Sequence, residues 1–443
     1  MAAGNHPGSG PPTTRLVPTT LAEVEALLAP VDQRRLRDFP GDATARQPVH
    51  TAYVPADRVE VGLAASWGAA ALMSVAEHAS DAETMAEVLG MDPALAHAVW
   101  PRVLPKLEQQ PIEDLRVDVE DGYQGGADAE DDDVVAAAAV VAAEVLVGAA
   151  PPFLGLRAKC LEPPVRARSL RSLDLFLGAL VDGVGGPARL DGTDLRVTLP
   201  KVTDVAQVEA MTTVLNALEV AHRLPPGRIG LELQVETPQA VLGPDGAATL
   251  APMVHAAGSR CRGLHFGTYD YSAALGIAAA HQAADHPAAD HAKHAMQVAV
   301  AGTPAHAVDG STNVLPVGTR DEVHAGWRLH AGLVRRALER GFYQGWDLHP
   351  AQLVTRYVAT YAFFRQALPA AATRLRAYRS ERGGSVLDEP ATARALAAVL
   401  VRGLDCGALD HDEVVAASEL DRATLDQLAG RDGSGVRVSS PEK

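Results

Sequence analysis

Short apolar runs alternate along the chain with longer segments in which apolar residues recur at helical spacing. Runs of about four to eight apolar residues bounded by Gly and Pro are typical of buried parallel strands joined by helices. The strands that we predict lie at residues 51–54, 115–119, 153–158, 195–199, 229–235, 263–266, 305–308 and within 342–348. Eight strands alternating with helices predict an α/β fold, a closed (β/α)8 TIM barrel.

Helical segments also lie outside the regular barrel repeat. Residues 57–113 form a long insertion after the first strand, and residues 369–430 form a C-terminal helical cap with a break at Gly383-Gly384. We expect both to restrict access to the barrel mouth or to make an oligomer interface, and a chain without residues 369–443 to keep a folded barrel. The predicted divisions are a disordered tail (1–15), the barrel domain (16–368), the cap (369–430) and a second disordered tail (431–443).

Composition narrows the class of protein. Of the 443 residues, 47% are hydrophobic and 21% are charged, so the chain can bury a large core. The net charge of −16 and the lack of a dense Lys/Arg cluster disfavour nucleic acid as a partner. The three cysteines match no metal or disulfide spacing, and no apolar stretch reaches about 18 residues. We therefore expect a cytoplasmic protein with no membrane partner.

The stretch between Gly227 and Ser272 contains two candidate metal-binding carboxylates. Two predicted strands in this stretch are followed by the carboxylates Glu236 and Asp270. Because the carboxyl ends of parallel strands meet at one end of a barrel, both acids are expected to face one pocket. Two carboxylates repel there unless they share a proton or a hard cation such as Mg²⁺. Either acid alone could be a solvated loop residue or a helix cap, but together they favour a metal site.

Two other groups of polar residues are interpreted as surface features. The acidic run at residues 128–133 is predicted to be a solvated helix start, with Asp132 or Asp133 as the cap. Four histidines are close in sequence, but they lack the further ligands and rigid setting of a zinc site. These histidines are His281, His286, His291 and His294.

Seven segments, in order, resemble one known family. They read LRVDVEDGY, GLRAK, VTLPKV, LQVETPQAV, GLHFGTYDYS, AHAVDG and GFYQGWDLHPAQL. Over about residues 50–365 the chain is similar to the citrate lyase beta-subunit and malyl-CoA lyase family, and to the class II pyruvate aldolases such as 4-hydroxy-2-oxo-heptanedioate aldolase. The order of the motifs is more specific than any single motif.

The resemblance implies a divalent-metal lyase, with Mg²⁺, Mn²⁺ or another divalent ion, that makes or breaks a C–C bond next to the carbonyl of a 2-oxo acid or acyl-CoA. It implies Glu236 and Asp270 as metal ligands, and Arg157 as the group that holds the substrate carboxylate and enolate oxygen. Glu120 and Asp121 match acids that orient water or a base. Lys201 and His349 match motif positions whose expected role is substrate binding.

Each of these residues also has a simpler interpretation. Arg157 could be an ion-pair partner in the acidic mouth, and Glu120 or Asp121 could only fix Arg157 or a ligand water. His349 could make a structural hydrogen bond, and Tyr269 and Tyr271 could line the pocket or pack beneath it.

The chain departs from the lyase pattern where coenzyme A is concerned. Tyr53-Val54-Pro55-Ala56 replaces Phe-Val-Pro-Gly without the preceding Arg-Ser pair, and Ala158-Lys159 follows Arg157 where Ile-Asn is common. The predicted function is therefore a metal-dependent C–C lyase or aldolase. Its alternatives are a malate-synthase-like condensing enzyme, a thioesterase, or a catalytically silent metabolite-binding barrel. A homo-oligomer is expected.

Overall fold

The structure, a computed structural model, describes residues 15–43, 45–379 and 389–431. All but residues 15 and 431 of the predicted tails (1–15 and 431–443), and the predicted helix break at Gly383-Gly384, lie outside these residues. By its internal contacts the chain divides into residues 1–40 and residues 41–443. In the part of residues 1–40 that the structure describes, helix α1 (Pro18–Asp38) has no buried residue.

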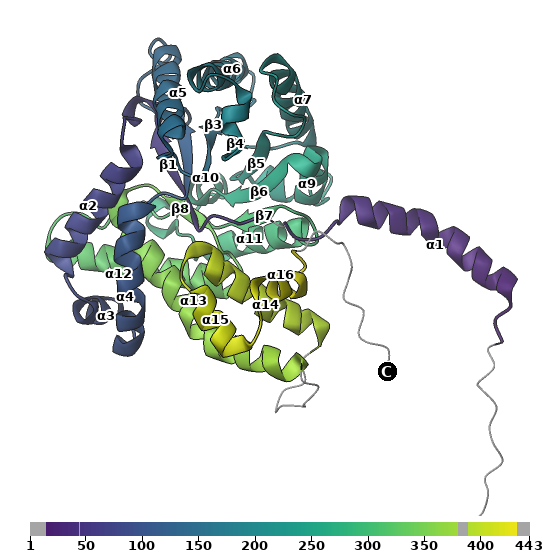
Figure 1. Cartoon of the computed structure of the whole chain (residues 1–443). Coiled ribbons are helices and arrows are strands. Elements are labelled where there is room, and N and C mark those ends of the chain that lie inside the picture. Colours follow the sequence, from purple (N-terminus) through teal and green to yellow (C-terminus); the bar gives the residue numbers. More distant parts are fainter. Residues whose placement is uncertain (1–14, 44, 380–388, 432–443) are drawn as a thin grey trace, which may run out of the picture. The chain divides into compact units, whose positions relative to one another are not determined.

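Residues 41–443 contain the predicted barrel. Eight strands form a parallel sheet in the order β7-β6-β5-β4-β3-β2-β1-β8 (Figure 1). β7 and β8 are not joined by a ladder, but the Asp309 N–H donates to the Gln344 carbonyl across this seam at 2.9 Å. The strands are β1 (His50–Pro55), β2 (Asp114–Asp118), β3 (Phe153–Arg157), β4 (Asp194–Leu199), β5 (Gly230–Val235), β6 (Cys261–Phe266), β7 (His306–Val308) and β8 (Gly345–Asp347). The predicted fold class is confirmed.

Helices connect successive strands, and several begin with a side-chain cap. The Asp204 carboxylate caps α7 and a Thr319/Glu322 capping box begins α12, so local sequence fixes these starts. The helices after the strands are α2 (Leu63–His78), α3 (Ala82–Leu89), α4 (Pro93–Gln109), α5 (Glu130–Val147), α6 (Arg166–Gly183), α7 (Val205–Ala221), α8 (Pro238–Val241), α9 (Leu250–Ala257), α10 (Thr268–Ala274), α11 (Pro287–Val300), α12 (Arg320–Glu339), α13 (Pro350–Arg379), α14 (Pro390–Cys406), α15 (His411–Ser418) and α16 (Arg422–Leu428).

The prediction for the start of α5 was wrong. The helix begins at Glu130 and has no side-chain cap, so Asp132 and Asp133 lie in its first turn. Glu130 is only 1% exposed and accepts a hydrogen bond from Ser172 at 2.5 Å. Glu130 is therefore buried between α5 and α6, whereas the acidic run suggested that it is solvated.

The barrel interior contains a charged layer. The Arg116 guanidinium, fully buried, donates to Asp114 at 2.8 Å and to Glu232 at 2.9 Å. Arg196 donates to the other Glu232 oxygen at 3.1 Å, and His265 lies 3.4 Å from Glu232. Barrel interiors more commonly hold bulky aliphatic side chains. Here the buried charges are paired and hydrogen-bonded, which is the condition for keeping them in a low-dielectric interior.

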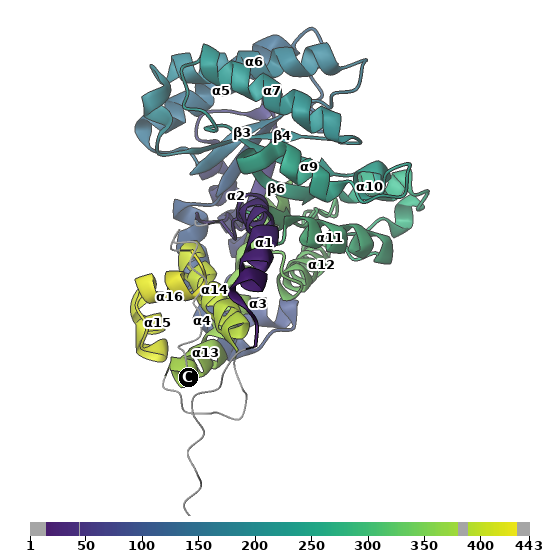
Figure 2. The ribbon, with the colours of Figure 1, turned by 90° about the vertical axis from the view of Figure 1, so that its right-hand side faces the viewer.

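A second hydrophobic core lies beside the barrel. It joins α2, α3 and α4 of the insertion to α12, α13 and the C-terminal helices, through residues such as Trp100, Tyr361 and Leu400. Figures 1 and 2 show α14, α15 and α16 gathered along α13, away from α5, α6 and α7. The insertion and the cap therefore pack into one helical layer.

The cap contacts the barrel at the end opposite to the one expected. Arg394 of α14 pairs with Asp42 at 3.0 Å, and Arg402 of α14 lines a pocket with residues that precede β7 and β8. These segments meet the amino-terminal ends of the strands. The described contacts thus contradict the expectation that the cap restricts the mouth at the carboxyl ends.

Candidate active site at the barrel mouth

The carboxyl ends of β2 to β6 bring most of the predicted site residues together. Glu120 follows β2, Arg157 ends β3 and Lys201 follows β4. Glu236 directly follows β5, and Asp270 lies in the first turn of α10, after β6. Because the strands are parallel, these five residues come from neighbouring positions around one end of the barrel.

Asp118 fixes the orientation of Arg157. The Arg157 Nε and Nη2 atoms donate to the two Asp118 oxygens at 2.6 and 2.5 Å, and the guanidinium stacks over the Tyr53 ring at 4.8 Å. The remaining nitrogen, Nη1, lies 3.8 Å from Glu120. The fork that was predicted to hold a substrate carboxylate is thus engaged by Asp118, and Nη1 is the atom directed toward Glu120.

Asp118 also shapes the turn that carries the acidic pair. Its oxygens accept the Glu120 N–H at 2.9 Å and the Gly122 N–H at 3.1 Å. A Cβ on Gly122 would lie 2.5 Å from Asp118 Oδ2, so this position needs glycine for steric reasons. The sequence does not single out Asp118, because its motif offers three acids and the predicted roles fall on the adjacent pair Glu120 and Asp121.

Lys201 touches all four carboxylates of the mouth. Its Nζ contacts Glu120, donates to Asp121 at 2.8 Å and lies 3.7 Å from Asp270. Its backbone N–H donates to Glu236 Oε1 at 2.7 Å. Lys201 has a φ of 51°, an uncommon conformation for a residue with a side chain. The strained residue places both its backbone and its ammonium against the acids, which points to a functional site.

Glu236 is held where α10 approaches the end of β5. Its side chain is buried, and its Oε2 accepts the Gln234 side-chain amide at 3.3 Å. A Cβ on Gly267 would lie 2.4 Å from that same oxygen. The glycine of the FGTYD segment therefore lets the turn before α10 pass close to Glu236, and brings Asp270 to the same side of the mouth.

The electrostatics of these acids are strongly perturbed. Burial, reinforced by the Glu120 carboxylate, raises the pKa of Glu236 to about 8. Burial also raises the pKa of Glu120 to about 7, and it raises the pKa of Asp270 above its ordinary value. Burial opposes ionisation of Asp121 as well, yet its contacts with Glu120 and Lys201 lower its pKa. Such perturbed groups gather at functional sites more often than elsewhere.

The donor set fits a hard divalent cation. Asp118 neutralises Arg157, so four carboxylates share the positive charge of Lys201, and a dication would relieve the remaining repulsion. Glu236 and Asp270 could supply one oxygen each, with water and substrate oxygens completing the shell, as is usual for Mg²⁺. No cluster of three or more His, Cys, Asp or Glu arranged to hold a metal occurs among the described residues. The site therefore suits a metal ion that takes only some of its ligands from the protein and the others from substrate and water.

Tyr269 lies in the first turn of α10, after β6, and His349 lies between β8 and α13. The Tyr269 hydroxyl donates to the Asn313 side chain at 2.8 Å and accepts the Asn313 N–H at 2.6 Å, which ties the β6 and β7 loops together. His349 Nδ1 accepts the Ala351 N–H at 3.2 Å, and burial lowers the pKa of this histidine. Tyr271 is buried and packs edge-on against Phe266. The contacts of these three residues are structural.

The four histidines of the predicted surface group are spread over the segment that leads into α11. His291 and His294 are exposed, and His286 accepts the Ala288 N–H at 3.1 Å as the cap of α11. These histidines are close in sequence because His286 caps α11 and because His291 and His294 lie on the exposed face of that helix.

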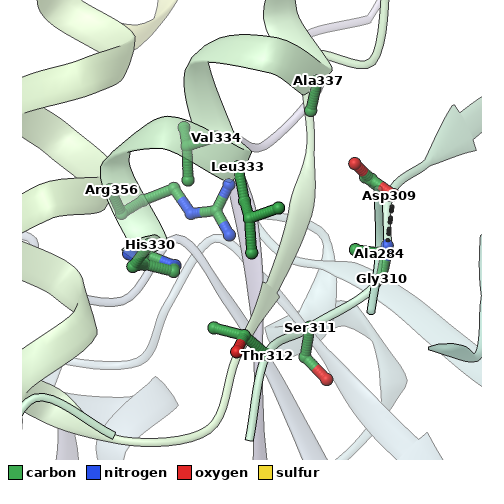
Figure 3. A pocket seen from close by; sticks show the side chains of 10 residues that line it. All are labelled: Ala284, Asp309, Gly310, Ser311, Thr312, His330, Leu333, Val334, Ala337 and Arg356. Atoms are coloured by element: carbon green, nitrogen blue, oxygen red, sulfur yellow. Dashed lines mark hydrogen bonds between the residues drawn. The ribbon is translucent and has the colours of Figure 1, made fainter. Parts of the chain in front are cut away.

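A small polar pocket lies beside the ends of β7 and β8, away from the carboxylates (Figure 3). Arg356 and His330 both reach it, and both contact Asp347, at 3.0 and 3.2 Å. Asp309 on the opposite wall pairs with Lys293 at 3.0 Å. The cavity measures about 10 Å³, which is room for about one water. Its charged groups are paired, so it is a structural feature of the seam.

Comparisons with known proteins agree with the fold. A family model described as a domain of unknown function, DUF6986, matches residues 28–432. A comparison with curated protein sequences gave no match. Among solved structures, a citrate lyase from Burkholderia xenovorans LB400 has 19% identity and a TM-score of 0.54, and the match covers 85% of this chain and 97% of that one. This likeness shows the fold alone.

Two further structures match less well. A malate synthase from Haloferax volcanii has 13% identity and a TM-score of 0.49, over 89% of this chain and 93% of that one. The protein CitE from Mycobacterium tuberculosis, in complex with magnesium, acetoacetate and coenzyme A, has 19% identity and a TM-score of 0.46, over 82% of this chain and 99% of that one. Across the described part of this chain, no helix is long and apolar enough to span a membrane.

Proposed function

The chain belongs to the DUF6986 family, and we propose that its barrel is a divalent-metal-dependent carbon–carbon lyase or aldolase. The observation that carries this proposal is the cluster of four carboxylates around Lys201, next to an arginine with one free edge. Such a mouth can hold a dication and, beside it, a substrate that develops negative charge. A 2-oxo acid or an acyl-CoA is the class of substrate that suits it.

The proposed metal ligands are Glu236 and Asp270. A Mg²⁺ or Mn²⁺ ion held there would polarise the substrate carbonyl and lower the energy of the enolate charge by several kcal/mol. Arg157 would donate from Nη1 to the same developing charge. Because Asp118 holds the other two nitrogens, the guanidinium keeps one orientation and needs no reorganisation during the reaction.

Glu120 is the proposed general base. Its pKa of about 7 suits proton transfer near neutral pH, and Lys201 and Arg157 both lie beside it. In the cleavage direction, the Glu120 carboxylate takes the proton of the substrate hydroxyl group on the carbon β to the carbonyl. The C–C bond then breaks, its electron pair forms the enolate, and the hydroxyl carbon leaves as a carbonyl. Asp121 would keep Lys201 in place, while Tyr269 and His349 would bound the substrate from neighbouring loops.

Alternative activities use the same groups in different ways. A malate-synthase-like condensing enzyme would form the enolate from an acyl-CoA, and a thioesterase would direct water at the thioester. A catalytically silent barrel would bind an anionic metabolite on Lys201 and Arg157 without forming an enolate. Proton exchange at the methyl group of pyruvate separates the silent barrel from the enolate-forming enzymes.

The test is therefore exchange of pyruvate methyl protons for deuterium, followed by NMR, with purified protein and Mg²⁺ or Mn²⁺. We expect metal-dependent exchange that Glu120→Gln lowers by about a hundredfold or more, the usual size of a general-base contribution. An absence of exchange with pyruvate and with acetyl-CoA, under conditions in which the protein binds the metal, would contradict the lyase, and hydrolysis of acetyl-CoA would then separate the thioesterase from the silent barrel.

The metal ligands are tested separately by calorimetry. Glu236→Gln and Asp270→Asn are each expected to abolish binding of Mg²⁺ and Mn²⁺ while the protein stays folded, because both side chains end at the mouth. Asp182→Asn, at an acid of α6, is the matched control and should bind as wild type does. Wild-type affinity in either mouth variant would contradict the two-carboxylate site.

A further inference from the structure

A second pocket lies at the opposite end of the barrel from the mouth. It is lined by residues that precede strands, among them Gln47 before β1, Thr303 before β7 and Tyr343 before β8, together with His306 at the start of β7. α14 of the C-terminal layer closes it with Arg402. Because all strands run parallel, residues that precede strands meet at the end opposite to Glu236 and Asp270.

Among the described residues, no carboxylate forms an ion pair with Arg402, although Asp42 and Asp405 act on it from a greater distance. Arg402 makes no hydrogen bond or ion pair within the described part of the chain, and its Nε is buried without an acceptor. The two neighbouring arginines differ, since Arg394 pairs with Asp42 at 3.0 Å and Arg431 with Asp405 at 2.6 Å. A partly buried guanidinium normally has its donors satisfied, because an unpaired buried charge is costly.

The surroundings orient Arg402 toward the pocket. Its guanidinium stacks on the Tyr343 ring at 4.4 Å, so the ring covers one face and the in-plane N–H groups are free to donate. Burial and the nearby positive charge of Arg402 lower the pKa of His306 to about 3. This imidazole is therefore neutral and can donate one N–H. Asp42 also lines the pocket, but its Oδ2 already accepts from Arg394. The donors that the pocket offers an anion are therefore the Arg402 guanidinium and the His306 imidazole, since the amide N–H groups of Gln47 and Gln297 already donate elsewhere.

We propose that this pocket binds a small oxyanion, the carboxylate or phosphate group of a metabolite, on Arg402. Its volume of about 200 Å³ is below the roughly 300–1,000 Å³ of pockets for drug-sized ligands, so the ligand has few heavy atoms. A planar guanidinium edge suits the two oxygens of either group. The proposal concerns a different end of the barrel from the proposed catalytic function and does not depend on it.

The position of the pocket gives the ligand a structural consequence. Residues 305–307, at β7, and Tyr343, before β8, line it, and β7 and β8 are the pair of strands that no ladder joins. A bound anion would connect Arg402 of α14 with both sides of this seam. It would therefore stabilise the barrel where backbone pairing is weakest.

The experiment uses the full chain in low-salt buffer with EDTA, so that no divalent metal holds an anion at the mouth. Inorganic phosphate and succinate are titrated separately by calorimetry, which distinguishes a phosphate ligand from a carboxylate ligand. Hydrogen exchange with and without the tighter anion then locates the site. We expect saturable binding of at least one anion and slower exchange in residues 300–309 and 341–347.

Arg402→Met keeps the length of the side chain and removes the charge, and it is expected to weaken binding by about ten- to a hundredfold. Arg171→Met, at an arginine of α6 that is 60% exposed and lies outside the pocket lining, is the control and should leave the affinity unchanged. Should Arg402→Met fail to fold, Ala301→Glu at the rim provides a carboxylate that competes for Arg402 and should block binding. Absence of saturable binding, unchanged affinity in Arg402→Met, or protection at residues 118–122 and 199–203 instead would overturn the proposal.

Discussion

Asp118 is the residue on which the chemistry of the mouth depends most. It binds two nitrogens of Arg157 and two backbone N–H groups of the turn that carries Glu120. One carboxylate therefore fixes both the arginine and the proposed base. Groups that orient catalytic side chains in this way are as sensitive to substitution as the catalytic groups themselves.

Replacing Arg157 tests its role toward substrate. Lysine keeps the charge but cannot bind both Asp118 oxygens while directing a third donor at the mouth. Arg157→Lys is expected to keep divalent-ion affinity and to lose about thirty- to several-thousand-fold in pyruvate-proton exchange, which corresponds to about 2–5 kcal/mol. The loss should appear in both kcat and kcat/KM. Loss of metal binding, or exchange at the wild-type rate, would make Arg157 a structural counter-ion.

The raised pKa of Glu236 predicts how pH acts on the metal-free protein. A carboxyl group with a pKa of about 8 in the folded state holds a proton that the unfolded chain releases near pH 4.5. Stability should therefore fall as the pH rises from about 4.5 to about 8, by up to a few kcal/mol, because the folded state binds more protons in that range. Denaturant unfolding in EDTA measures this, and Glu236→Gln should flatten the dependence. A divalent ion should restore stability mainly above neutral pH. A wild-type stability that rises through this window would contradict the assignment.

At the scale of elements, the turn between β6 and α10 sets the distance between Glu236 and Asp270. Gly267→Ala would place a methyl group 2.4 Å from Glu236 Oε2, so the carboxylate or the turn must move. We expect at least a tenfold loss of divalent-ion affinity by calorimetry, since one such displacement costs about 1.4 kcal/mol or more. Gly192→Ala, where a Cβ meets open space, is the control. Equal metal affinity in the two variants would mean that the turn does not position the ligands.

The positions of the strands were predictable because they are short, largely apolar runs with polar residues, Gly or Pro at their ends. The run Leu115 to Val119 lies within one residue of β2 at each end, and the end of strand five at Val235 is the same in both. The charged barrel layer was not predictable. Arg116 and Glu232 interrupt their apolar runs and are far apart in sequence. Only the closed barrel brings Arg116 Nη2 of β2 to within 2.9 Å of Glu232 Oε2 of β5.

The positions of several predicted site residues could be derived from sequence, because strand ends can be recognised there. Glu120, Arg157, Lys201, Glu236 and Asp270 were expected at one mouth, and the structure brings them together. The roles of Asp118 and Lys201 were not readable. Asp118 acts by hydrogen bonds to a turn, and Lys201 acts through an unusual backbone conformation, neither of which residue type alone reveals.

At the scale of the whole molecule, residues 41–443 contain two hydrophobic cores with different roles. The barrel core supports the mouth, whereas the second core joins the insertion, α13 and the C-terminal helices. The cap contacts the barrel end opposite to the mouth. Stability of the C-terminal layer should therefore be separable from metal binding.

Leu400 tests this separation. It is fully buried in the second core, so Leu400→Ala is expected to cost about 2–5 kcal/mol of stability in denaturant unfolding. The affinity for Mg²⁺ should stay unchanged, because α14 packs on α13 and α16 and reaches the barrel at the end opposite to the mouth. Leu329→Ala, at a residue that is 41% exposed, is the control and should change stability by about 0.5 kcal/mol or less. A loss of Mg²⁺ affinity in folded Leu400→Ala protein would show that the two cores are coupled.

Removing the C-terminal helices tests whether the rest of the chain needs them for stability. From the sequence, truncation is expected to leave a folded barrel, but the shared core predicts otherwise. A chain that ends at Glu389 would expose the faces of Tyr361 and Phe364 of α13 that α14 helps to bury. Such an apolar area exceeds what soluble monomers usually expose, so aggregation or a lowered Tm is expected. Light scattering and thermal unfolding measure both. A monodisperse truncated protein with the wild-type Tm would show that the insertion and α13 form a complete layer by themselves, and that the C-terminal helices serve another purpose.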